Sequence, residues 1–140
     1  MAKLSVIIPV YNMSGHLRQC LLTIRETIRL PYEVIVVDDG SSDDESISIP
    51  NAGDDVYVLG SEVHRGFSHA VNMGIRASVG EVLLFLHADV LLAPFAVEDM
   101  LDSLIHDAAL GAVCAVASSV YERAQRLPDT PYEGWNGFVA

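Results

Sequence analysis

The distribution of apolar residues predicts a chain that alternates between β-strands and α-helices. Apolar runs of strand length, several of them rich in β-branched residues, cover residues 4–10, 33–37, 56–59, 81–86 and 111–117. Between them, apolar residues recur every three or four positions in segments 14–30, 66–78 and 94–107, which is typical of helices with one buried stripe. Residues 43–55 are acidic and contain Pro50 and Gly53, so any helix there is short.

Two of these helices have a defined apolar face. The first ends before Pro31, and its stripe consists of Leu17, Leu21, Ile24 and Ile28. In the second helix we expect one side to be buried, comprising Phe67, Ala70, Val71, Gly74 and Ile75. Pro94 suits the first turn of the third helix, where a missing N–H has no consequence.

This order of elements predicts an α/β fold with a mostly parallel sheet, right-handed crossovers and helices on both faces. The length of 140 residues fits one domain, which we place at residues 1–118. Residues 119–140 contain two prolines, two glycines and the only tryptophan without a clear period. They are predicted to form an irregular tail or the start of a further, acceptor-side region.

Polar residues gather at the points where three of the strands end. Pro9 to Asn12 follow the first strand, Asp38 to Ser42 the second, and His87 to Asp89 the fourth. Because carboxyl ends of parallel strands share one edge, and ligands bind beyond that edge, the three clusters predict a site. Each cluster alone has a plainer interpretation, in which Asp38 and Asp39 cap a turn and Asp89 caps the next helix.

Composition narrows the partners of this site. Eight Lys and Arg residues stand against 19 Asp and Glu, a formal net charge of -11, which disfavours nucleic acid as a partner. This negative charge would repel an anionic ligand, and a divalent cation bound in an acidic pocket can offset the repulsion. Much of the charge is equally consistent with a solvated acidic surface.

Cysteine use and hydropathy suggest where the chain resides. Cys20 and Cys114 lie in apolar stretches without metal-ligand spacing, so we expect two buried thiols. The most apolar segment, residues 82–97, is interrupted by polar residues and is too short to span a bilayer. We find no signal peptide and expect a cytoplasmic protein, with the inner face of a membrane as the alternative location for a longer form.

Four segments together resemble the family 2 glycosyltransferases, enzymes with the GT-A fold. They are PVYN, VVDDGSSDD, HRGFSHAVNMGIRASVGE and LLFLHADVLLAP, in the family's order and spacing from about Leu4 to Ala117. The resemblance implies that residues 1–118 form a Rossmann-like GT-A nucleotide-binding half. It also implies a nucleotide-diphosphate-sugar donor, a Mn²⁺ or Mg²⁺ ion, and inverting transfer to an unidentified acceptor. A UDP-sugar is the favoured donor, and GDP- and dTDP-sugars are the alternatives.

The resemblance assigns the nucleoside side of the site to the first two clusters and to the HRGF segment. Pro9, Val10, Tyr11 and Asn12 match the loop that borders the base and ribose. Asp39 matches the acid that accepts a hydrogen bond from a uracil-type ring nitrogen, and Asp38 is expected to order the loop or to contact the ribose. Arg65 matches a position near the base or diphosphate, or is simply an exposed loop arginine.

The segment His87-Ala88-Asp89 occupies the family's D-x-D position, beside the nucleotide. Asp89 matches the acid that binds the divalent ion between the two donor phosphates, whereas His87 replaces the first acid. His87 is therefore a second candidate metal ligand that would favour Mn²⁺, a sugar contact, or a buried hydrogen-bonded histidine without a ligand role. Gly66, Ala70, Asn72 and Gly74 match a family helix, in which we expect small residues to permit close packing on the sheet.

The resemblance leaves the general base unassigned. In the family this acid lies downstream of the strand matched by residues 111–117, and neither Asp129 nor Glu133 stands in a base motif. We therefore expect an N-terminal portion of a longer enzyme that binds donor without transferring it. The alternatives are a sugar-phosphate nucleotidyltransferase-like enzyme, which lacks its Gly-rich basic loop here, and a catalytically inactive nucleotide-binding module. A receiver domain is disfavoured because Lys3 is the only lysine, and a dinucleotide-binding domain because no G-x-G-x-x-G follows the first strand.

Overall fold

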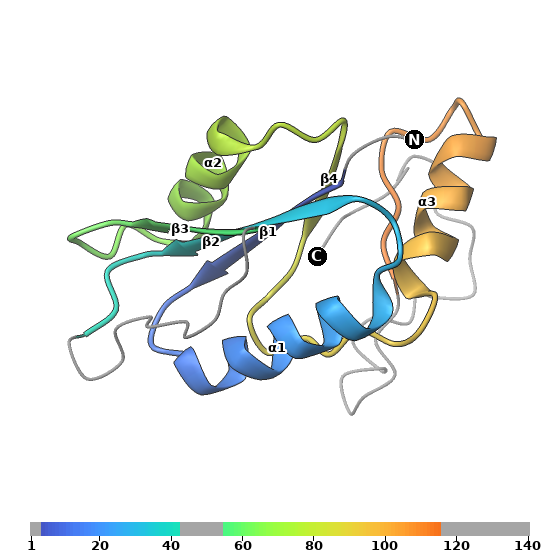
Figure 1. The fold of residues 1–140 in the computed structure, drawn as a ribbon. Coiled ribbons are helices and arrows are strands. Elements are labelled where there is room, and N and C mark those ends of the chain that lie inside the picture. Colours follow the sequence, from blue (N-terminus) through green and yellow to red (C-terminus); the bar gives the residue numbers. More distant parts are fainter. Residues whose placement is uncertain (1–3, 43–54, 116–140) are drawn as a thin grey trace, which may run out of the picture. The chain divides into compact units, whose positions relative to one another are not determined.

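The computed structural model describes residues 4–42 and 55–115. These residues form four strands and three helices in the predicted order (Figure 1). The strands are β1 (Leu4–Val10), β2 (Tyr32–Asp38), β3 (Val56–Gly60) and β4 (Val82–Phe85). The helices are α1 (Ser14–Thr27), α2 (Phe67–Ala77) and α3 (Ala96–His106).

The four strands form one parallel sheet in the order β3-β2-β1-β4. Strand β1 lies inside the sheet, and all seven of its residues are buried. Strands β1 and β2 are the two inner strands, and a strand covered on both faces has no solvent side. This explains why both are nearly continuous apolar runs in the sequence. The predicted α/β class with a parallel sheet is confirmed.

Helices α1 and α2 lie on opposite faces of this sheet (Figure 1). The predicted stripe of α1 is confirmed, because Leu17, Leu21, Ile24 and Ile28 are all buried. Helix α2 approaches the sheet through Gly74, where an added Cβ would collide with the side chain of Ile7. The small residue is therefore needed for close packing, as predicted.

The predicted buried face of α2 is wrong at two positions. Ala70 and Gly74 are buried, but Phe67 and Ile75 are exposed by 57% and 38%. The helix meets the sheet along a narrow line through its small residues, and Met73 packs beside that line against a cluster that includes Ile35 and Val37. Bulky residues to either side of a close approach remain at the solvent surface.

The end of the described chain also differs from prediction. Residues 111–115 form no strand, and residues 116–117 of the predicted strand lie outside the described residues. Cys114 is exposed, contrary to prediction, whereas Cys20 is buried as predicted. Helix α3 begins at Ala96 with Phe95 as its N-cap, which places Pro94 before the first turn rather than in it.

A buried polar cluster closes the amino-terminal edge of the sheet. Ser5 and Glu33 are paired in register on β1 and β2, and the Ser5 hydroxyl donates to Glu33 Oε1 at 2.6 Å. The same oxygen accepts the Val79 N–H at 2.8 Å, and Ser5 Oγ accepts the Gly80 N–H at 2.8 Å. These bonds satisfy a carboxylate that is only 5% exposed, and they tie the α2–β4 connection to the sheet.

The chain divides into two compact units, residues 1–94 and residues 95–140. The sheet, α1, α2 and all predicted site residues belong to the first unit. Among the described residues, no helix is long and apolar enough to cross a bilayer. The predicted tail at 119–140 and most of the acidic segment 43–55 lie outside the described residues.

Candidate functional site

The parallel register brings the predicted polar clusters to one edge of the sheet. Val10 at the end of β1 pairs with Asp38 at the end of β2, and the residue after Asp38 donates its N–H to the Val10 carbonyl at 2.9 Å. Strand β4 pairs with the other side of β1 and ends in the same direction, followed by His87 and Asp89. All three clusters therefore leave the carboxyl edge, where open α/β sheets bind ligands.

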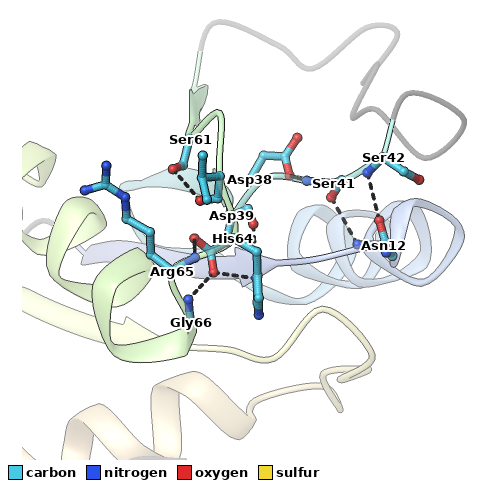
Figure 2. A network of polar contacts seen from close by, with 10 residues as sticks. Asn12, Asp38, Asp39, Ser41, Ser42, Ser61, His64, Arg65 and Gly66 are labelled. Atoms are coloured by element: carbon cyan, nitrogen blue, oxygen red, sulfur yellow. Dashed lines mark hydrogen bonds and ion pairs between the residues drawn. The ribbon is translucent and has the colours of Figure 1, made fainter.

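The first two clusters are joined by a pair of hydrogen bonds between their loops (Figure 2). The Asn12 N–H donates to Ser41 Oγ at 3.0 Å, and the Ser42 N–H donates to Asn12 Oδ1 at 3.0 Å. Asn12 has a φ of 52°, a left-handed conformation that asparagine tolerates better than most residues. Asn12 thus fixes the two loops to each other at the edge of the site.

Asp38 and Asp39 are adjacent in sequence, but their carboxylates point in different directions (Figure 2). Asp38 Oδ1 accepts the Ser41 N–H at 2.9 Å, which is the turn-capping contact that the plainer interpretation predicted. The Asp38 side chain therefore orders the loop after β2, as predicted. The Asp38 residue is partly exposed.

The carboxylate of Asp39 is directed inward to the segment before α2. Oδ1 accepts the Arg65 N–H at 3.0 Å, and Oδ2 accepts the Gly66 N–H at 2.6 Å. His64 Nδ1 lies 2.9 Å from Oδ2, and the Asp39 side chain is 4% exposed. A direct contact between Asp39 and a base stays a prediction, and the observed contacts give this carboxylate a second role, the organisation of residues 64–66.

Gly40 allows this arrangement. Its φ is 78°, and a Cβ at this position would lie 2.6 Å from His64 N and 2.8 Å from the Val63 carbonyl carbon. Backbone atoms cannot retreat as a flexible side chain can, so only glycine permits the loop after β2 to contact residues 63–64. The DDG sequence therefore places a buried acid against a neighbouring backbone.

His64 lies at the candidate site, although the sequence interpretation did not single it out. Its ring stacks on Tyr11 with centroids 4.0 Å apart and an angle of 28° between the planes. Its position next to Arg65 in the HRGF segment was the available clue. Tyr11 and His64 together form an exposed aromatic surface beside Asp39, which is the type of surface on which a flat base stacks.

Arg65 contributes its backbone to Asp39, while its guanidinium extends away from that carboxylate (Figure 2). The residue is exposed. The structure therefore agrees with either sequence interpretation of the side chain, a ligand contact or an exposed loop arginine. The backbone role was not foreseen, because a main-chain donor carries no sequence pattern of its own.

His87 and Asp89 form an exposed pair after β4. His87 Nδ1 lies 2.8 Å from Asp89 Oδ1, and both side chains are 52% exposed. The exposure excludes the interpretation of His87 as a buried histidine. Asp89 does not cap the following helix, since Phe95 holds that position. Ala88 between them is fully buried and anchors the segment.

Contacts with α1 hold the backbone that carries this pair. Cys20 Sγ lies 3.9 Å from the His87 carbonyl oxygen, and Thr23 Oγ1 accepts the Leu92 N–H at 3.2 Å. Burial, and secondarily the charge of Asp89, raises the pKa of the Cys20 thiol to about 12. This thiol is therefore protonated at neutral pH and acts as a packing group rather than a nucleophile.

The His87–Asp89 pair offers one imidazole and one carboxylate to a divalent ion. No group of three or more His, Cys, Asp or Glu side chains able to hold a metal occurs in the described part of the chain. Mg²⁺ in nucleotide sites is commonly bound by one or two carboxylates, with phosphate oxygens and water completing the shell. Asp89, whose half-exposed carboxylate faces His87 through Oδ1, fits a site of this shared kind.

Comparison with known proteins decides the class. The profile of "Glycosyl transferase family 2" matches residues 5–138, nearly the whole chain. The chain belongs to this family. Glycosyltransferase AglE of Haloferax volcanii is 38% identical over 90 residues, covering 61% of the present chain and 30% of AglE. An uncharacterized glycosyltransferase of Escherichia coli, YibD, is 32% identical over 108 residues, 75% of the present chain and 31% of YibD.

Solved structures confirm the GT-A fold for this family 2 chain. The mannosyltransferase PcManGT of Pyrobaculum calidifontis, in complex with GDP-Man and Mn²⁺, superposes with a TM-score of 0.68 at 25% identity, covering 83% of the present chain and 36% of PcManGT. S. aureus TarS 1–349 gives a TM-score of 0.62 at 25% identity, with coverage of 74% and 32%. The chain spans about a third of the length of these relatives.

Proposed function

We propose that this glycosyltransferase domain binds a nucleotide-diphosphate sugar together with Mn²⁺ or Mg²⁺ and presents it for inverting transfer to an acceptor. The observation that carries the proposal is the convergence of three polar loops on one sheet edge. The Tyr11–Asn12 loop, the Asp38–Ser41 loop and the His87–Asp89 segment all follow neighbouring parallel strands. The GDP-Man and Mn²⁺ bound to PcManGT support this class of ligand.

The nucleoside would lie at the first two loops. Pro9 and Val10 end β1, Tyr11 is 43% exposed, and Asn12 holds the facing loop in place. The partly exposed carboxylate of Asp38 suits a ribose hydroxyl, and the side chain of Arg65 is long enough to reach the base or the diphosphate. UDP-sugars remain the favoured donors from the resemblance, with GDP- and dTDP-sugars as alternatives.

The diphosphate and the metal ion would lie at the third loop. Asp89 would hold the divalent ion, while His87 would orient the Asp89 carboxylate through its 2.8 Å contact or serve as a second ligand. When bound, such an ion offsets the negative charge that develops on the departing nucleoside diphosphate. The protein's own contribution is to fix the carboxylate, and the Thr23 and Cys20 contacts do so from α1.

Inverting transfer requires a general base near the acceptor hydroxyl. Of the described acids at the sheet edge, Asp39 is buried, and the proposal assigns Asp38 and Asp89 to the donor side, so none is assigned the role of the base. Asp129 and Glu133 lie outside the described residues. We therefore propose that the base and the acceptor site are supplied by sequence beyond the motifs matched here.

Calorimetric titration with UDP and GDP, each with and without Mn²⁺, tests the proposal. We expect binding that Mn²⁺ strengthens and that loses this dependence in Asp89→Ala. Asp102→Ala, which removes an exposed acid of α3, is the matched control and should retain it. If a folded sample binds neither nucleotide with or without metal, the proposed function is wrong.

A further inference from the structure

We draw no further inference here: the strongest candidate, the outer edge of strand β3 with the exposed side chains of Tyr57 and Val58, carries nothing because no contact within residues 4–42 and 55–115 shows whether a second copy, another protein or a further part of a longer chain covers it.

Discussion

The hydroxyl of Thr23 on α1 accepts the backbone N–H of Leu92 at 3.2 Å, three residues beyond Asp89. The same hydroxyl donates to the Cys20 carbonyl at 2.8 Å, so its orientation is fixed by the helix. A residue of α1 thereby restrains the loop that carries the proposed metal-binding carboxylate. This link gives the first prediction.

Thr23→Val, a change of nearly equal volume, should lower the free energy of unfolding by about 1 kcal/mol, the typical worth of one hydrogen bond. It should also weaken Mn²⁺-dependent nucleotide binding several-fold, because the Asp89 loop is less restrained. Denaturant unfolding and calorimetry measure the two effects. Thr23→Ser keeps the hydroxyl and should retain both properties. Unchanged binding in Thr23→Val would show that the loop is fixed by other contacts.

Asp39→Asn should be far more harmful than Asp38→Asn. An amide at position 39 would direct an NH₂ group at N–H donors that now face a carboxylate, which should cost roughly 1–3 kcal/mol and impair nucleotide binding. Asp38→Asn preserves the acceptor for the Ser41 N–H and should change stability by about 0.5 kcal/mol or less. Chemical denaturation of the two variants in parallel makes the comparison, and equal stability would contradict the role assigned to Asp39.

Gly40→Ala should destabilise the domain by roughly 1–3 kcal/mol, because it combines a left-handed φ with a collision against the backbone of residues 63–64. Gly15→Ala is the opposite case. Gly15 lies in α1 with open space around it, so alanine there should stabilise the helix by up to about 1 kcal/mol. Thermal unfolding of both variants checks the two signs, and a neutral Gly40→Ala would show that the loop can move away.

The two cysteines should differ in reactivity. At pH 8 a thiol reagent should label exposed Cys114 in the native protein and reach Cys20 only after denaturation, since Cys20 is buried and protonated. Native Cys114→Ser should therefore react hardly at all. Rapid labelling of Cys20 in the folded protein would contradict its packing beneath the His87 carbonyl.

Raised pKa values also predict the alkaline limit of stability. The folded state keeps the Cys20 thiol protonated above its ordinary value of 9.0, up to about 12. The stability that this provides is complete below pH 9 and is lost as the pH rises from 9 towards 12. Burial and then Asp55 also raise the pKa of Tyr32, which acts in the same direction. Unfolding followed at pH 8 to 11 should show this decline, and Cys20→Ser should reduce its slope.

The sheet could be predicted from sequence because hydrophobic residues dominate its strands. The ends of β1 match the prediction, and those of β2, β3 and β4 lie within one residue of it. The predicted strand at 111–117 is not formed over its described residues, since a short apolar run gains strand structure only from a partner. Periodicity likewise could not show that Gly74 brings α2 so close that Phe67 stays outside.

The three polar clusters of the candidate site were predictable, but its backbone contacts and the position of the His64 ring were not. Parallel topology alone is enough to bring the clusters around Asn12, Asp38 and Asp89 to one edge of the sheet. The inward turn of Asp39 depends on three donors, two of them main-chain N–H groups that any residue supplies. The contacts of His64 with Tyr11 and Asp39 follow from this geometry, which no spacing in the sequence encodes.

The buried contact between Ser5 and Glu33 has a consequence for how the strands find each other. A slip of one position between β1 and β2 would set the Glu33 carboxylate against an aliphatic side chain, without its hydroxyl donor and inside the protein. Aliphatic neighbours such as Val34 and Ile35 tolerate exchange with one another, whereas this polar couple does not. The pair therefore favours the native register of β1 and β2. In a misregistered sheet, the loops that follow the two strands would be shifted relative to each other along the strand direction.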